Sequence, residues 1–179
     1  MTAHAALLVI DVQLGAFDGV RRRPIETPER FLSTLKRLIA AARHQHLPVI
    51  FVQDNGEPGG AFEPNTPHWA IHPHLAPLPT EPVIQKRKAS AFHESSLPHL
   101  LKERHISELI ICGLHSRSCV AQTALDGIRR GFSVRMVADG HAPAPERPAM
   151  TRAQLNDGFR AQGMDVLPSD AVIERMALR

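Results

Sequence analysis

LIICGLHSRSCVAQTALDGIRRGFSVRMV, residues 109–137, is the stretch that decides the fold of this 179-residue chain. It begins with the apolar, largely β-branched run 109–112, typical of a strand buried on both faces. Gly113 interrupts that run, and a helical spacing of apolar residues begins at Cys119. Residues 133–137 then read as the next strand. Strand, loop, helix and strand make a βαβ unit, whose loop lies at the carboxyl edge of a parallel sheet, where α/β proteins place their sites.

The same alternation runs through the rest of the chain. Short apolar strands are expected at 6–10, 49–52, 83–84, 109–112, 133–137 and 165–167. Helices are expected from near Pro28, Ser96, Cys119 and Met150, with final helical turns over 171–178. Alternating strands and helices predict a doubly wound α/β fold. The length predicts a single domain, residues 1–179.

Composition narrows the class of protein. Hydrophobic residues make up 43% and charged residues 22%, and the net charge is +3. The basic run Arg21-Arg22-Arg23 has no interleaved aromatic residues, so no nucleic-acid partner is expected. Two cysteines without a Cys-x-x-Cys pair favour a reducing compartment. No apolar stretch approaches ~20 residues and no secretory signal is evident, so we expect a cytoplasmic protein without a membrane partner.

Three reactive side chains follow three of the expected strands. Asp11 follows 6–10, Lys86 follows 83–84, and Cys119 opens the helix after 109–112. A helix N-terminus favours a thiolate, a carboxylate can accept the thiol proton, and an ammonium group stabilises both anions. The alternatives stay open at this point: a turn-forming aspartate, a solvent-facing lysine and a small core cysteine.

Three segments carry a family resemblance: VIDVQ (9–13), KRKASAF (86–92) and GLHSRSCV (113–120). They resemble the isochorismatase-like cysteine hydrolases, which include nicotinamidases, N-carbamoylsarcosine amidases, ureidoacrylate hydrolases and isochorismatases. The resemblance implies a three-layer αβα, Rossmann-like fold with a six-stranded parallel sheet. It implies a catalytic triad of Asp11, Lys86 and Cys119, and favours Lys86 over Lys88. It also implies a homo-oligomer, a dimer or tetramer.

The resemblance further implies a cis peptide bond between Leu114 and His115. The backbone N–H groups of His115 and Cys119 would then form an oxyanion hole. In the expected mechanism Cys119 attacks a carbonyl carbon, Asp11 moves the proton, and a thioester is hydrolysed. The expected function is therefore cleavage of a C–N bond in a small amide or carbamoyl compound, without a cofactor.

The expected pocket walls come from strand ends and loops. The candidate substrate contacts are Gln13, Phe17, Gln53, Trp69, Leu114 and His115. His115 stands where the family usually has a small or β-branched residue, and its side chain either enters the pocket or points away.

No metal site is expected. Nicotinamidases carry an Asp-x-His metal motif after the second strand, and Gly56 stands here in place of that histidine. The spacing of His68, His72 and His74 leaves a zinc site as the less favoured alternative.

Two other functions compete with the amidase. One is hydrolysis of a vinyl ether, as in isochorismatases, which needs an acid and a positioned water more than a thiolate. The other is a catalytically silent α/β binding protein, because a fold does not by itself establish an activity. A dinucleotide site is excluded, since Asp11-Val12-Gln13-Leu14-Gly15 replaces the Gly-x-Gly-x-x-Gly fingerprint. The identity of the substrate is not readable from the sequence.

Overall fold

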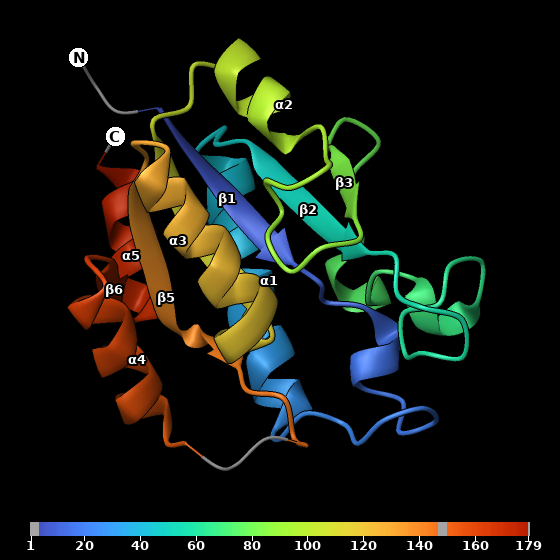
Figure 1. Ribbon diagram of the computed structural model, residues 1–179. Coiled ribbons are helices and arrows are strands. Elements are labelled where there is room, and N and C mark those ends of the chain that lie inside the picture. Colours follow the sequence, from blue (N-terminus) through green and yellow to red (C-terminus); the bar gives the residue numbers. More distant parts are fainter. Residues whose placement is uncertain (1–3, 147–149, 179) are drawn as a thin grey trace.

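A computed structural model describes residues 4–146 and 150–178. Its centre is a six-stranded, all-parallel sheet with the strand order β3-β2-β1-β4-β5-β6. Figure 1 shows β3, β2 and β1 side by side in this sheet. The strands are β1 (Ala5–Ile10), β2 (Val49–Asp54), β3 (Val83–Lys86), β4 (Glu108–Leu114), β5 (Ser133–Ala142) and β6 (Asp165–Leu167). The expected doubly wound parallel sheet is confirmed.

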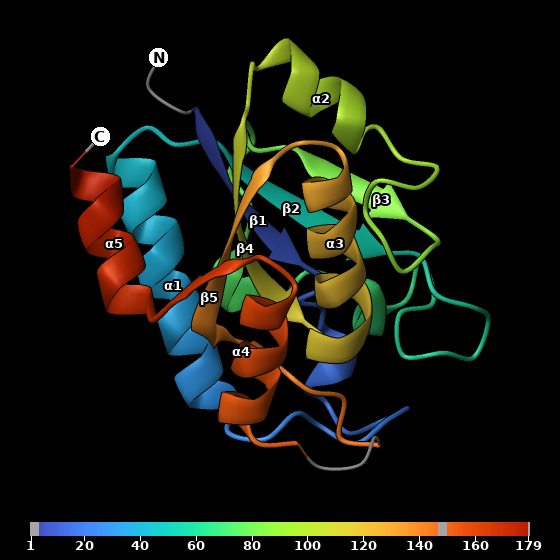
Figure 2. The ribbon, with the colours of Figure 1, turned by 60° about the vertical axis from the view of Figure 1, so that its left-hand side comes forward.

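Helices cover both faces of this sheet. They are α1 (Pro28–His44), α2 (Leu97–Glu103), α3 (Ala121–Arg129), α4 (Arg152–Ala161) and α5 (Ser169–Ala177). Figure 2 shows α1 and α5 side by side on one face, with α3 and α4 on the other. The result is the expected three-layer αβα arrangement.

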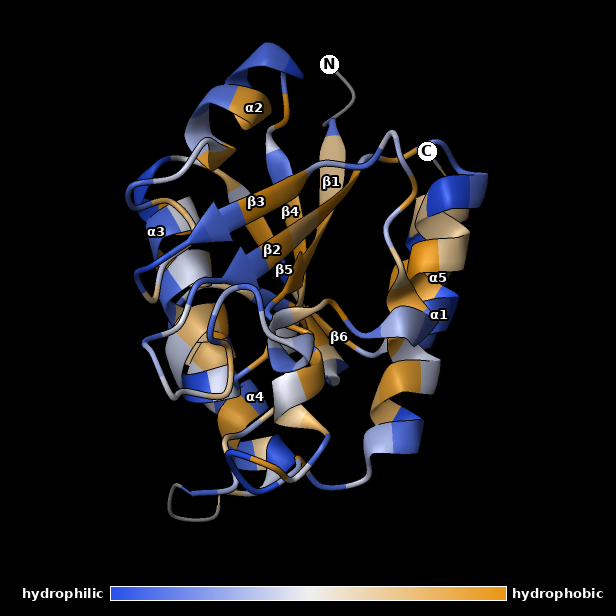
Figure 3. Cartoon of the chain, turned by 90° about the vertical axis from the view of Figure 1, so that its right-hand side faces the viewer, coloured by the Kyte–Doolittle hydropathy of each residue, from blue (hydrophilic) through white to orange (hydrophobic). Residues whose placement is uncertain are grey.

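The central strands β1 and β4 are almost wholly apolar because both of their faces are buried. In β1, Leu7 and Val9 pack into the hydrophobic cluster under α1 and α5, whereas Leu8 and Ile10 pack into the cluster under the opposite helices. All four side chains are at most 1% exposed. The hydropathy colouring shows the same pattern, with apolar strands enclosed between helices whose outer faces are polar (Figure 3). Burial on both faces is what makes a parallel strand a continuous hydrophobic run.

Several element boundaries differ from the sequence expectation. Strand β4 continues to Leu114, beyond the expected residues 109–112, and strand β5 continues to Ala142, beyond the expected residues 133–137 and their expected end at 138–140. Helix α4 begins at Arg152, where Thr151 and Gln154 form a capping box. A π-helix, η4 (Ser116–Val120), precedes α3, so Cys119 lies in a π turn and not in the first turn of an α-helix. Within the described residues no helix is long and apolar enough to span a membrane.

The centre of the sheet is a topological switch point. Strands β1 and β4 are neighbours, and the chain leaves them toward opposite edges of the sheet. Ligand sites of open α/β sheets form at such a point, beyond the carboxyl ends of the strands. Gly113 at the end of β4 has φ +126°, and a Cβ there would lie 2.1 Å from the Ile10 carbonyl oxygen. Glycine is required here because β1 and β4 approach each other so closely beside the site.

Candidate active site

Asp11, Lys86 and Cys119 meet beyond the carboxyl ends of the strands. The Lys86 Nζ lies 2.9 Å from Asp11 Oδ2 and donates a hydrogen bond to Cys119 Sγ at 3.3 Å. Lys86 and Asp11 are each 1% exposed, whereas Cys119 is a partly exposed residue. The structure thus gathers three residues that are far apart in the sequence into one cluster.

A fourth member of the cluster, Asp54, was not among the sequence-based candidates. Its Oδ1 accepts a hydrogen bond of 2.9 Å from Lys86 Nζ. Asp54 ends β2 and is the register partner of Lys86, which ends β3. Adjacent strands lie about 4.8 Å apart, so a lysine on β3 reaches a residue after β1 only by passing the end of β2. The register of those two strands is the signal that would have found Asp54.

The Asp11 carboxyl is buried among charges of both signs. Burial raises its pKa, Lys86 lowers it and the Asp54 charge raises it, so that the pKa rises from the usual 3.8 to about 6. Burial alone would lower the pKa of Lys86, but Asp11, Cys119 and Asp54 together hold it above its usual value. Lys86 therefore stays cationic, and Asp11 has the proton affinity of a base that works near neutral pH.

The Cys119 thiol does not have the expected lowered pKa. Burial and the Asp11 charge raise the pKa of Cys119 to about 12, and the opposing effect of Lys86 is smaller. The helix N-terminus is expected to favour a thiolate, but the cluster already contains two carboxylates for one ammonium group, so a further anion is disfavoured. The sulfur carries its proton at rest and needs a base in order to react.

His115 stands at the start of the Cys119 turn. The Leu114–His115 peptide bond is cis, and the His115 carbonyl accepts hydrogen bonds from the backbone N–H groups of Ser118 and Val120 at 3.0 and 3.4 Å. The bond from Val120 is the i→i+5 contact of a π turn, a geometry frequent at functional sites. The His115 side chain is 6% exposed.

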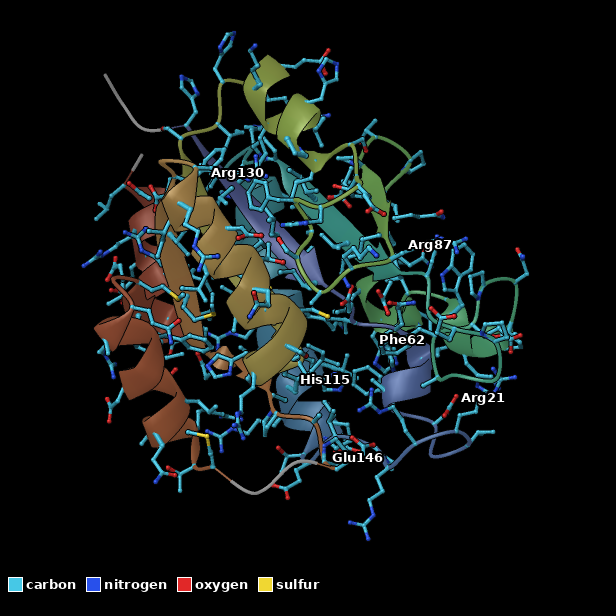
Figure 4. All side chains as sticks on the ribbon, in the orientation of Figure 1. Arg21, Phe62, Arg87, His115, Arg130 and Glu146 are labelled. Atoms are coloured by element: carbon cyan, nitrogen blue, oxygen red, sulfur yellow. The ribbon has the colours of Figure 1, made fainter. Side chains whose placement is uncertain are left out.

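Glu146, after β5, borders the same region (Figure 4). The Arg22 guanidinium lies 2.6 Å from Glu146 Oε2. Hydrogen bonding to Arg22 is the largest of the effects that lower the pKa of Glu146, and the charge of His115 contributes further. The loop that follows Asp11 and the loop that follows β5 are thereby joined beside His115.

Two of the expected substrate contacts instead hold the scaffold together. The Gln13 amide donates to the Asp54 and Trp69 carbonyls at 3.0 and 2.9 Å, and its oxygen accepts from the Asp54 N–H at 2.8 Å. The Gln53 amide also donates to the Trp69 carbonyl, at 3.0 Å. Gln13 and Gln53 are buried, and their amides bind the main chain of the long loop.

The remaining candidate contacts, Trp69, Phe17 and Leu114, are bound to or packed against neighbouring residues. The half-buried Trp69 donates its indole N–H to Asn55 Oδ1 at 2.9 Å. Phe17 packs against Phe31 and lies edge-on to His72, on the α1 side of the sheet. The Leu114 side chain is fully buried in the same core. In this structure Leu114 offers a ligand only its backbone.

The loop histidines each have other partners. His68 Nδ1 lies 2.5 Å from Asp18 Oδ2, and His72 Nδ1 accepts from the His74 N–H at 3.3 Å. In the described ranges, no three His, Cys, Asp or Glu residues are grouped so that they could hold a metal ion. Gly56 is packed against Phe62, whose carbonyl oxygen would lie 3.1 Å from a Cβ at that position, so the loop has little room for the histidine of the nicotinamidase motif.

A buried row of hydrogen-bonded side chains binds Ser116, the first residue of η4, to β5 and α4. Ser116 Oγ lies 2.8 Å from His141 Nδ1, and His141 Nε2 lies 2.9 Å from Asn156 Oδ1. The Asn156 amide donates to the Ala138 carbonyl, so its oxygen is the acceptor and His141 Nε2 carries the hydrogen. Burial lowers the pKa of His141 and keeps it neutral in this role. Periodicity gave no sign of this row, because its members are isolated polar residues in apolar surroundings.

Fold and site together define a class: an αβα protein with a thiol, an ammonium group and carboxylates at the switch point of a parallel sheet. The isochorismatase-domain family model matches residues 5–156. The chain belongs to the isochorismatase family, as its sequence motifs indicate.

Named relatives show which proteins this chain resembles. Streptothricin hydrolase of Streptomyces noursei is 36% identical over 76% of this chain and 54% of its own length. Ureidoacrylate amidohydrolase of Pseudomonas syringae pv. syringae is 26% identical over 80% of this chain and 73% of its own length. The crystal structure of an isochorismatase from Pseudomonas putida KT2440 matches with a TM-score of 0.83 and 30% identity, covering 94% of this chain and 89% of that one. The chain spans about half the length of the streptothricin hydrolases it matches.

Proposed function

We propose that this protein is a cysteine hydrolase that cleaves a C–N bond of a small amide or carbamoyl compound through a thioester on Cys119. The observation that carries the proposal is the contact of a buried ammonium group with both a carboxylate and a partly exposed thiol, at 2.9 and 3.3 Å. Relatives named as a hydrolase and an amidohydrolase support the same class of reaction.

The first step is attack by sulfur. Asp11 takes the proton from Cys119 Sγ as the sulfur bonds to the substrate carbonyl carbon. This transfer leaves the charge of the cluster unchanged, whereas loss of the proton to solvent would add a negative charge near Asp54. The raised pKa of Asp11, about 6, makes it the proton acceptor in this step.

The remaining steps return the enzyme to its starting state. The carbonyl oxygen becomes an oxyanion, which the backbone N–H groups of His115 and Cys119 stabilise by roughly 3 kcal/mol each. The C–N bond then breaks, and the proton on Asp11 passes to the departing nitrogen. Water attacks the thioester carbon and gives a proton to Asp11, the C–S bond breaks, and the proton returns to sulfur as the acid leaves.

The test is a panel of small amides, ureas, carbamoyl compounds and lactams, assayed for release of ammonia or amine. Cys119→Ala should reduce turnover of any accepted substrate by roughly 10⁴-fold or more. Cys112→Ala is the matched control: Cys112 is fully buried, its Sγ lies 3.5 Å from the Leu8 carbonyl, and its loss should leave the chemistry in place. Full activity of Cys119→Ala would refute covalent catalysis, and vinyl-ether hydrolysis that survives thiol alkylation would favour an isochorismatase reaction instead.

A further inference from the structure

We infer that Asp54 is a positioning residue of this site: it holds the Lys86 ammonium between two carboxylates and orients it toward the Cys119 sulfur. The inference rests on the proposed function and extends the expected triad to four residues.

The Lys86 ammonium has three N–H donors and three acceptors around it. Its Nζ lies 2.9 Å from Asp11 Oδ2, 2.9 Å from Asp54 Oδ1 and 3.3 Å from Cys119 Sγ. The hydrogen bonds to Asp54 and Cys119 and the ion pair with Asp11 together orient the ammonium group. Without Asp54 one donor would lose its acceptor, and the ammonium would be free to rotate away from the sulfur.

Besides accepting a hydrogen bond from Lys86, Asp54 changes the electrostatics of the cluster through its charge. In the described part of the chain, four titratable groups face one another at this point: Asp11 after β1, Asp54 on β2, Lys86 on β3 and Cys119 on η4. The neighbouring Gln13 amide is uncharged. The Asp54 charge raises the pKa of Asp11 and also that of Cys119. It strengthens Asp11 as the base and keeps the resting sulfur protonated.

Hydrogen bonds fix the backbone of Asp54 at the end of β2. Gln13 binds both its N–H and its carbonyl, at 2.8 and 3.0 Å, and the neighbouring Asn55 N–H donates to the Lys86 carbonyl at 2.8 Å. The Asp54 side chain is 23% exposed, whereas that of Asp11 is 1% exposed. Asp54 is thus the more exposed of the two carboxylates that flank Lys86.

The test compares Asp54→Asn with wild type in two measurements that report on different groups. Removing the Asp54 charge should move the acid limb of the kcat/KM profile to lower pH, because the pKa of Asp11 falls. Turnover at pH 7 should fall roughly tenfold, less than the ~10²–10⁴-fold that loss of a catalytic base costs. Alkylation of Cys119 by iodoacetamide at pH 8, followed by peptide mass spectrometry, should become several-fold faster, because the pKa of Cys119 also falls.

Three controls distinguish this role from a general loss of structure in the variant. Asp54→Glu restores the charge and should return the acid limb toward its wild-type position. Asp165→Asn removes a carboxylate that pairs with Arg135 and Arg175 on the surface, and should leave both measurements unchanged. Treatment of the wild type with EDTA should also change neither, and a shift on chelation would overturn the inference by placing a metal at Asp54.

Failure of this inference is distinct from failure of the proposed function. If Asp54→Asn leaves the acid limb and the alkylation rate at their wild-type values, Asp54 has no such role, even where Cys119→Ala has abolished turnover. If no compound in the panel is hydrolysed, alkylation of Cys119 still measures the influence of Asp54, since it requires no substrate.

Discussion

Two groups of ion pairs in this molecule differ sharply in their exposure to solvent. In the strand-end cluster, made of Asp11, Asp54, Lys86 and Cys119, the Lys86 side chain is 0% exposed. In the loop rim, made of residues 12–27, 55–82 and 143–146, Arg22 pairs with Glu146 at 2.6 Å with side chains 21% and 43% exposed. The contact distances are similar, so the difference lies in the surroundings and not in the geometry.

This difference in surroundings decides what each pair does. A buried charge that loses its partner is left uncompensated, which costs about 3–5 kcal/mol. Exposed pairs are worth about 0–1 kcal/mol because water competes for both partners. The strand-end cluster can therefore hold shifted proton affinities, whereas the rim can be rebuilt at little cost and so can adapt to different substrates.

Replacing Lys86 with methionine should have the largest effect. Lys86→Met leaves two carboxylates facing each other without a cation, so the free energy of unfolding should fall by about 3–5 kcal/mol at pH 7. Turnover should fall by roughly 10³-fold or more, because the sulfur and the base both lose their common partner. Urea unfolding and the amide assay measure the two effects. Lys88→Met, at an exposed position two residues away, is the control and should resemble the wild type.

Asp11→Asn should separate activity from stability. The folded pKa of Asp11, about 6, lies above the usual 3.8, so the native state binds more protons than the unfolded state between these values. Stability attributable to Asp11 is therefore present below pH 4 and is lost as the pH rises through 6, at a cost on the order of 3 kcal/mol at pH 7. Asn mimics the neutral acid and removes this cost.

The variant should accordingly lose ~10²–10⁴-fold in turnover yet unfold at a higher urea concentration than the wild type at pH 7. Below pH 4 the two proteins should converge. Asp157→Asn, at a carboxylate that is 76% exposed, should show neither effect. An Asp11→Asn protein that is less stable than the wild type at pH 7 would show that the Lys86 contact outweighs burial, and would place Asp11 with the structural ion pairs.

The same division separates what the sequence predicts from what it does not. Converging strand ends of a parallel sheet make Asp11, Lys86 and Cys119 candidates for one site, and the family resemblance is what favours Lys86 over Lys88. Asp54 also ends a strand, but the register that places it beside Lys86 is a property of two strands and is not visible in either one alone. The raised pKa of Cys119 depends on the number of charges within a few ångströms, which no sequence spacing reveals.

The rim was less predictable for a related reason. Residues 54–80 have no periodicity, so the direction of each side chain depends on tertiary contacts. The Gln13 amide, expected to face a substrate, is used to bind the main chains of Asp54 and Trp69. Leu114 belongs to a strand that extends two residues beyond its expected end, which places its side chain in the core.

Gln13→Ala should produce an intermediate effect, because Gln13 joins the two regions. The substitution leaves the Asp54 N–H and carbonyl and the Trp69 carbonyl without this partner, so the free energy of unfolding should fall by roughly 2–4 kcal/mol. The acid limb of kcat/KM should shift in the same direction as in Asp54→Asn, since Asp54 loses its support. Gln53→Ala removes a single bond to Trp69 and should cost about 1 kcal/mol without moving the acid limb.

Arg22→Gln should have the smallest effect on stability, and it tests whether the rim is as adaptable as its exposure suggests. The loss of the Glu146 pair should change the free energy of unfolding by less than about 1 kcal/mol. Because Glu146 borders His115, the substitution should change KM more than kcat, which is the pattern of a contact that is equal in the ground and transition states. Glu146→Gln and the double variant complete a cycle, measured by steady-state kinetics and urea unfolding. A coupling energy above about 2 kcal/mol, or a fall in kcat as large as that of Asp54→Asn, would show that this pair behaves like the buried cluster. Solvent exposure would then fail to distinguish the two regions.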